Sequence, residues 1–250
     1  MNSMNKTVLR LLLLLSGSFL LAACDSDDDV TITPVPPLTP APPPVLASFD
    51  VTVTNLTNAQ PLSPIAVIAQ LEGYSYFTVG SPASAGLEQM AEGGDNSALL
   101  AEADAEAVVL ATGSGAAPIG PAGSETVTIS VLLNQLPGLR ISVATMLVNT
   151  NDAFSGLNAV AVDNMAVGDQ ANVFSVAYDA GTEADSEEAA TIPGPAGGGE
   201  GFNAARDDQA DQVSMHSGVV SRDDGFATSD LTEQHRFDNP VALIQIVRTQ

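Results

Sequence analysis

Hydrophobic and polar residues alternate in a series of short stretches, the first of which begins at residue 49. There, apolar Phe49, Val51 and Val53 fall on one face of an extended segment, and Asp or Thr occupies each intervening position. A period of two with β-branched residues predicts a half-buried strand. Strand-like runs of this kind occur at 49–54, 65–69, 74–79, 106–111, 126–133, 141–149, 173–178 and 241–248.

The stretch 84–106 breaks this pattern. Leu87, Met90 and Ala91 have helical spacing, and a second short helix is expected to begin near Leu99. Turn signals rich in Gly and Pro separate the strand-like runs, and neither a fixed repeat nor a β–α–β alternation is visible. The pattern predicts an all-β protein, an antiparallel β-sandwich with a short helical insertion.

The first 24 residues have the organisation of an export signal. Lys6 and Arg10 precede an apolar core, Leu11–Leu21, that is too short to span a bilayer, which needs about 20 residues. The sequence Leu-Ala-Ala-Cys that follows resembles a bacterial lipobox, and Cys24 is the single cysteine of the chain. We therefore expect residues 1–23 to be removed and Cys24 to be lipidated, which would place the protein in the bacterial cell envelope, anchored to the inner or outer membrane.

Residues 24–46 read as a linker. Four aspartates lie within 25–29, and seven of the eleven residues from Pro34 to Pro44 are proline. Such a run favours extended polyproline geometry, which makes a semi-rigid spacer. Residues 47–250 are long enough to form one domain with a single core.

Composition excludes several classes of function. The chain has 30 acidic and 7 basic residues, and only five arginines and no lysine follow Cys24. This balance excludes general nucleic-acid binding, which needs clustered basic residues. Without lysine, the mature chain cannot form a P-loop or a lysine Schiff base. A single cysteine excludes an internal disulfide and a Cys-rich zinc site.

Histidine offers little support for an enzyme. His216 and His235 are the only imidazoles, and they lack the close spacing of common zinc or iron motifs. We interpret both as structural or surface residues. The alternative is an envelope hydrolase that uses one of them with a nearby carboxylate, because the members of a catalytic triad need not be neighbours in sequence.

Acidic and amide residues cluster after strand-like runs in the second half of the chain. The clusters fall at 149–158, 178–188 and 206–211. Loops at one end of a sandwich converge, so their carboxylates would repel one another, and a divalent cation would remove that repulsion. Oxygen ligands without sulfur favour calcium over zinc. An ordinary solvated acidic surface is the alternative reading.

Two motifs carry a resemblance to a known family. The stretch 142–158 (SVATMLVNTNDAFSGLN) and the stretch 178–183 (YDAGTE) resemble the spondin N-terminal domain family, as do the later IPGP at 192–195 and RFDNPV at 236–241. The resemblance covers most of residues 49–248. It implies a β-sandwich like that of calcium-dependent lipid-binding domains, with a calcium site at the loop end. Carried over by motif, the ligands would be Asp152, Asp179 and Glu183.

This chain departs from the animal members of that family in two ways. Its domain has no cysteines, and its acidity would repel anionic polysaccharide or membrane unless calcium bridges the two. The resemblance therefore bears on fold and metal more than on partner.

These observations lead to a hypothesis for function. We expect a non-enzymatic, adhesion-type binding module with a calcium (Ca²⁺) site, anchored to a membrane by its lipid and held off it by the proline spacer. It would contact an envelope or extracellular partner that the sequence does not identify. The alternatives are an acidic spacer lipoprotein without metal and, with less support, the hydrolase that uses His216 or His235.

Overall fold

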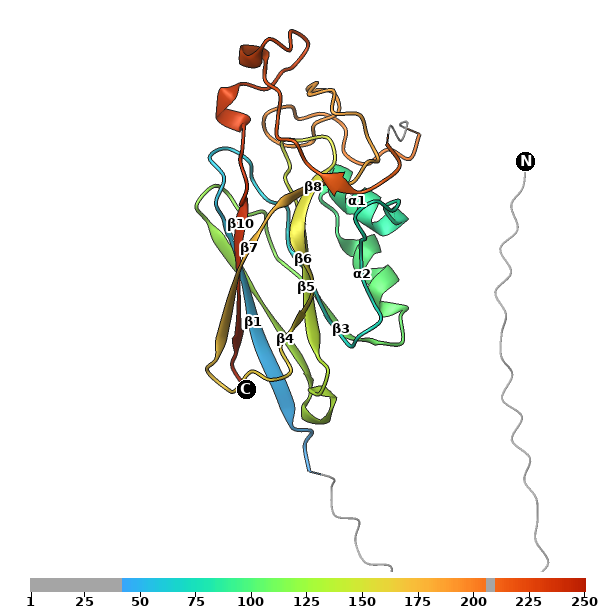
Figure 1. Ribbon diagram of the computed structural model, residues 1–250, viewed down its shortest axis with the longest axis vertical. Helices are drawn as coiled ribbons and strands as arrows, with labels where there is room; N and C mark the ends of the chain where they lie inside the picture. The colour runs from blue at the N-terminus through green and yellow to red at the C-terminus, as the bar shows by residue number, and fades with distance from the viewer. Residues whose placement is uncertain (1–41, 206–209) are drawn as a thin grey trace, which may run out of the picture. The chain divides into compact units, whose positions relative to one another are not determined.

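The computed structural model describes residues 42–205 and 210–250. The signal, Cys24 and most of the linker expected from the sequence lie outside these residues. A compact unit extends from Pro43 to Gln250. It contains two antiparallel sheets with their inner faces packed together, which confirms the predicted β-sandwich (Figure 1).

One sheet has four strands in the order β4-β1-β10-β7, and the other has six in the order β3-β2-β5-β6-β8-β9. The bounds of the strands are β1 Leu46–Asn55, β2 Ala66–Gln70, β3 Val109–Ser114, β4 Ser124–Leu132, β5 Arg140–Met146, β6 Ala153–Ala161, β7 Gln170–Ser175, β8 Ala177–Asp179, β9 Ser214–Met215 and β10 Ala242–Arg248. Only Val176 separates β7 from β8, so the chain crosses from one sheet to the other at this point.

The alternation that predicted β1 produces the core between the sheets. Phe49, Val51 and Val53 point inward from β1 and are buried against Ile141 and Val143 of β5. Strand β5 is buried along almost its whole length, because its other face is covered as well. That second cover explains why β5 is apolar or small at nearly every position.

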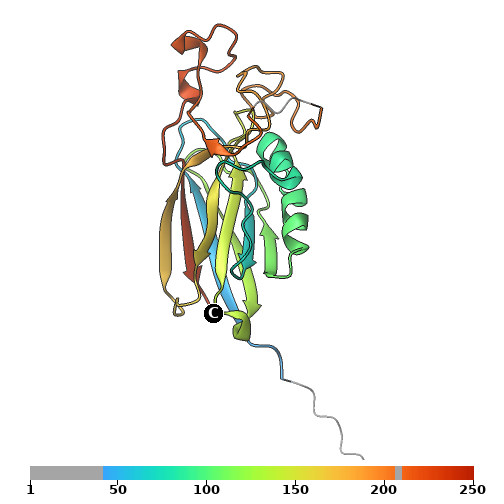
Figure 2. The ribbon, with the colours of Figure 1, turned by 45° about the vertical axis from the view of Figure 1, so that its right-hand side comes forward.

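Two helices cover the outer face of the six-stranded sheet, as Figures 1 and 2 show: α1 (Ala85–Gly93) and α2 (Ser97–Asp104). Ser84 caps α1 by accepting a hydrogen bond from the Leu87 N–H at 3.1 Å, and α1 ends at Gly94 in the left-handed region. Glu102 of α2 accepts a hydrogen bond from the Gly86 N–H at 2.7 Å. Its charge therefore lies at the positive end of α1.

Two parts of the strand pattern differ from the prediction. The stretch 74–79 is not a strand. Its apolar character comes from Tyr76, which is buried beneath the helices and donates a hydrogen bond to the Val143 carbonyl at 2.9 Å. The residue pattern also did not predict β6, which is rich in small and polar residues. A Cβ at Gly156 would lie 1.9 Å from the Val143 oxygen, so this tightly packed strand requires glycine there.

The strands place the connecting segments at two ends of the sandwich. We call the segments 147–152 and 180–241 the loop end. We call residues 42–45, 133–139 and 162–169 the entry end, because β1 begins there. Figure 1 shows the orange and red loops of the loop end opposite the C-terminus, which lies at the entry end. Three short 3₁₀ helices belong to these segments: Leu133–Gln135, Arg222–Asp224 and Glu233–His235.

Candidate metal centre at the loop end

A tight turn between β5 and β6 positions the first acidic residue of the site. The Thr150 hydroxyl donates to the Leu147 carbonyl at 2.6 Å and accepts from the Ala153 N–H at 3.0 Å. The Leu147 N–H closes the turn on the Ala153 carbonyl at 2.8 Å. Asp152 therefore enters β6 with its side chain wholly buried.

The end of β8 positions the second acidic residue. Asp179 pairs with Ala153 across the sheet, and its Oδ1 accepts a hydrogen bond from the Gly181 N–H at 2.7 Å. Gly181 has φ +72°, and a Cβ there would lie 2.4 Å from the Gln212 carbonyl oxygen. The Asp-Ala-Gly motif thus forms an Asx-type turn that only glycine fits.

The main chain after this turn binds one oxygen of Asp152. The N–H groups of Thr182 and Glu183 donate to Asp152 Oδ2 at 2.8 and 3.1 Å, and the Thr182 hydroxyl lies 3.3 Å from the same atom. The other oxygen, Oδ1, is buried without any hydrogen-bond partner. A buried carboxylate oxygen left in this condition is costly unless a proton or a cation binds it.

Asp152 belongs to a cluster of three carboxylates. Asp152, Asp179 and Asp185 each offer an oxygen, and these atoms lie within 4.8 Å of one another. Asp152 is buried, Asp179 is half-buried and Asp185 is exposed, so the cluster is open to solvent on one side. We call these three residues the aspartate cluster; within the described part of the chain, no other group of three potential ligands meets this distance.

The aspartate cluster is electrostatically strained in the absence of a cation. Burial, followed by the charge of Asp179, raises the pKa of Asp152 to about 8, against the lowering effect of the two main-chain N–H donors. Burial also raises the pKa of Asp185, while His216 beside it acts in the opposite direction. A divalent cation would replace the proton that this arrangement retains near neutral pH.

His216 faces the cluster but does not offer a ligand. Its buried ring lies with Nε2 3.8 Å from Asp185 Oδ1, while Nδ1 accepts a hydrogen bond from the Gly218 N–H at 2.9 Å. The neutral ring therefore carries its proton on Nε2, and no lone pair points at the aspartate cluster. The donor set is oxygen only, which suits a hard cation such as calcium.

Two buried side chains behind the cluster hold the loop that carries Asp185. Asn151 donates to the Thr191 hydroxyl at 2.8 Å, and its Oδ1 accepts from the Glu187 N–H at 3.3 Å. The Glu187 carboxylate accepts from the Val220 N–H at 3.0 Å, and burial raises the pKa of Glu187 to about 7. The loop is thus fixed by Asn151, from the same turn that positions Asp152, and by its own Glu187.

The structure brings together two of the three ligands expected from the motifs. Asp152 and Asp179 meet, but the Glu183 carboxylate is not part of the aspartate cluster, and Glu183 contributes its main-chain N–H to Asp152. Asp185, two residues further on, takes the third position. Neither histidine belongs to the cluster, and His235 lies in the 3₁₀ helix Glu233–His235 with Nδ1 accepting from the Thr232 N–H.

Comparison with known proteins adds no relative. No protein-family model matches the chain, and no curated protein matches it. The spondin resemblance therefore stays a prediction based on the motifs. In the described residues, no helix has the length and apolar character needed to cross a membrane.

Proposed function

We propose that this protein is a lipid-anchored binding module of the bacterial envelope, whose loop end is organised by calcium bound at the aspartate cluster. The observation that carries the proposal is the Asp152 carboxylate, whose buried Oδ1 has no hydrogen-bond partner and which lies against two further carboxylates. Three carboxylates would supply part of the six to eight oxygens that calcium takes, and main-chain carbonyls and water would supply the rest.

The cation would act on structure. It would neutralise the repulsion among the three aspartates and fix the 180–188 loop against β6. The loop end would then present one defined surface to an envelope or extracellular partner. Both the sandwich fold and the spondin-like motifs support this reading, since Asp152 and Asp179, two of the three aspartates, lie in stretches that carry that resemblance.

The two histidines support a binding module over a hydrolase. A general base needs a free ring nitrogen aimed at its substrate. In both His216 and His235, Nδ1 accepts a main-chain N–H. In His216 the remaining nitrogen carries the proton that faces Asp185.

Thermal unfolding of the chain from Cys24 onward tests the proposal, with EDTA, calcium or magnesium added. Calcium is expected to raise the melting temperature more than magnesium does. With affinity in the range of extracellular modules, a calcium concentration ten times Kd would stabilise the fold by about 1.4 kcal/mol. The Asp152→Asn variant should lose this response. The control variant Asp238→Asn makes the same substitution at an exposed aspartate of the loop end and should keep it.

Equal melting in all three conditions would contradict the calcium site. The acidic spacer lipoprotein without metal would then be the better description. A calcium response that survives in Asp152→Asn would place the cation elsewhere on the acidic surface.

A further inference from the structure

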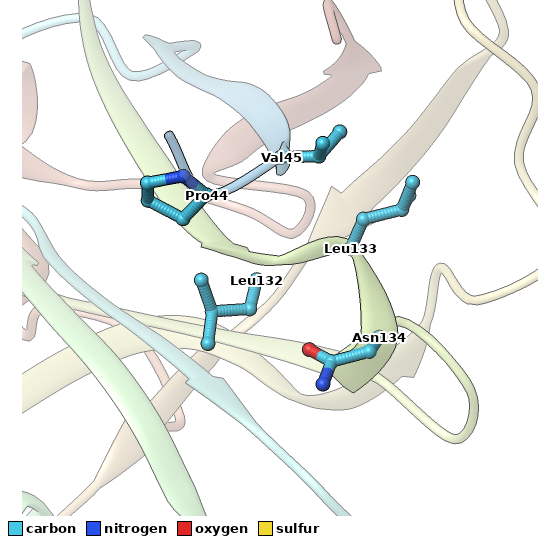
Figure 3. A pocket seen from close by; sticks show the side chains of 5 residues that line it. All are labelled: Pro44, Val45, Leu132, Leu133 and Asn134. Carbon is cyan, nitrogen blue, oxygen red and sulfur yellow. The ribbon is translucent and has the colours of Figure 1, made fainter. Parts of the chain in front are cut away.

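The entry end carries an exposed apolar patch. Val45 is 63% exposed, and Leu132 and Leu133 are each 41% exposed. Together with Pro44 and Asn134 they line a hollow of about 490 Å³ (Figure 3). We call these five residues the entry patch. The Leu133 N–H donates to the Val45 carbonyl at 2.9 Å, so the two segments of the patch are held together by the fold.

The patch lies in a region without charge. Neither 42–49 nor 129–139 contains an acidic or basic residue, in a chain with 30 acidic side chains. At the strand ends on the same side of the sandwich, Arg140 and Arg248 offset Asp163 and Asp169, while the exposed Glu72 and Glu106 lie beyond the ends of β2 and β3. The aspartate cluster, by contrast, lies at the loop end. An anionic surface would therefore repel the loop end more strongly than the uncharged segments that form the entry patch.

The position of the patch along the chain identifies what can cover it. Pro44 and Val45 are the residues through which the linker joins the first strand, and the expected lipid anchor, Cys24, precedes Pro44 by twenty positions. Any membrane that holds Cys24 is therefore always within one linker length of this end. A partner that requires diffusion would have to compete with a surface that is permanently tethered nearby.

We propose that the entry patch rests on the lipid bilayer that holds the anchor, with Val45, Leu132 and Leu133 in the interfacial region. The contact orients the domain, so that the loop end faces away from the membrane. This inference rests on the anchoring part of the proposed function, replaces the expectation that the proline spacer holds the domain off the membrane, and is independent of calcium. Aliphatic side chains at an interface gain free energy in proportion to the apolar area they bury, so a few residues suffice once the lipid anchor supplies the local concentration.

The chain offers a clean optical test because it contains no tryptophan. The Leu133→Trp variant places the only indole in the entry patch. The matched control, Phe174→Trp, places it on β7 in the four-stranded sheet, where Phe174 is 64% exposed. Both variants begin at Cys24, which leaves the compact unit from Pro43 intact, and the single thiol is coupled to a maleimide lipid. The vesicles contain phosphatidylcholine and phosphatidylglycerol, with or without brominated phosphatidylcholine.

On vesicles, the Leu133→Trp fluorescence should shift to the blue and be quenched by the brominated lipid, and the Phe174→Trp fluorescence should do neither. Adding Val45→Ser and Leu132→Ser to Leu133→Trp should abolish both effects. Because coupling replaces biological lipidation and EDTA is present throughout, the result does not depend on the calcium site.

Three outcomes would overturn the proposal. One is no change at either position, and another is an equal change at both, which would indicate adsorption of the whole surface. The third is a blue shift of Leu133→Trp without vesicles that grows with protein concentration, which would show that a second copy covers the patch.

Discussion

The two ends of this sandwich are built in opposite ways. At the entry end the connections are short, carry few charges and are closed by main-chain hydrogen bonds. At the loop end, within the described residues, longer irregular segments are held by buried polar side chains such as Asn151 and Asp152. Packing and short loops are therefore enough to order the entry end. The loop end depends on polar contacts that change with protonation and metal binding.

The largest predicted contrast between the ends is in side-chain packing. Phe154, just after the aspartate cluster, is fully buried against the rings of Phe77 and Tyr178 at 5.2 and 5.4 Å. Phe154→Ala should lower the free energy of unfolding by about 3–5 kcal/mol. Leu133→Ala at the entry end should change it by less than about 0.5 kcal/mol, since that side chain is exposed. Urea unfolding measures both, and similar losses would contradict the contrast.

A glycine pair sharpens the comparison. Gly181 at the loop end and Gly168 at the entry end both have positive φ, but a Cβ at Gly168 would meet nothing within 4 Å. Gly168→Ala should therefore cost only backbone strain, about 1–2 kcal/mol. Gly181→Ala adds a clash with Gln212 and should cost more than about 3 kcal/mol. It should also weaken the calcium response, because the Gly181 N–H holds Asp179. If denaturant titration shows the same loss of stability for both variants, the loop at Gly181 moves enough to accommodate the added Cβ.

The next expected difference between the two ends is the pH dependence of stability. In the metal-free fold, burial raises the pKa of Asp152 to about 8 and of Glu187 to about 7, from ordinary values of 3.8 and 4.5. Between about pH 4 and pH 8 the folded state binds more protons than the unfolded chain, so stability should fall as the pH rises. Each extra proton contributes a slope of about 1.4 kcal/mol per pH unit.

Melting temperatures in EDTA across this range measure that slope. Asp152→Asn should flatten it, and calcium should do the same in the native chain because a bound cation keeps Asp152 ionised. Stability that rises with pH in EDTA would contradict the buried, protonated carboxylate.

The smallest effect concerns a surface ion pair at the loop end. Arg236 Nη1 lies 2.8 Å from Asp224 Oδ1, and both side chains are substantially exposed to solvent. Arg236→Ala should leave the unfolding midpoint almost unchanged, because water and salt screen such pairs. A marked loss in urea unfolding would show that the exposed charges, and not only the buried ones, hold this end together.

Sequence patterns predicted the strands that alternate or are continuously apolar, and missed β6, whose small and polar residues follow neither pattern. Strand β1 alternates because only one of its faces is buried. Strand β6 interrupts its apolar residues with Ser155, Gly156 and Asn158, and at Gly156 Tyr76 and β5 approach too closely for any side chain. The apolar stretch 74–79 was misread for a related reason: its burial comes from contact with the helices, and no strand pairing is involved.

The site was predictable as far as its local turns. The motifs identified Asp152 and Asp179, whose positions depend on hydrogen bonds within a few residues. Asp185 takes the position expected for Glu183 because of a distant contact. The Glu183 N–H donates a hydrogen bond to Asp152, which lies thirty-one positions earlier in sequence. No local pattern contains that information.

The position of β1 has a mechanical consequence. This ten-residue strand follows directly on the linker and lies between β4 and β10, with antiparallel pairing on both sides. A pulling force between the proposed lipid anchor and a proposed partner at the loop end would enter the domain at β1 and act along this strand. Its two ladders would then be loaded in shear, with all their hydrogen bonds sharing the force at once. The domain would resist extension along this direction far better than if the same bonds opened one after another.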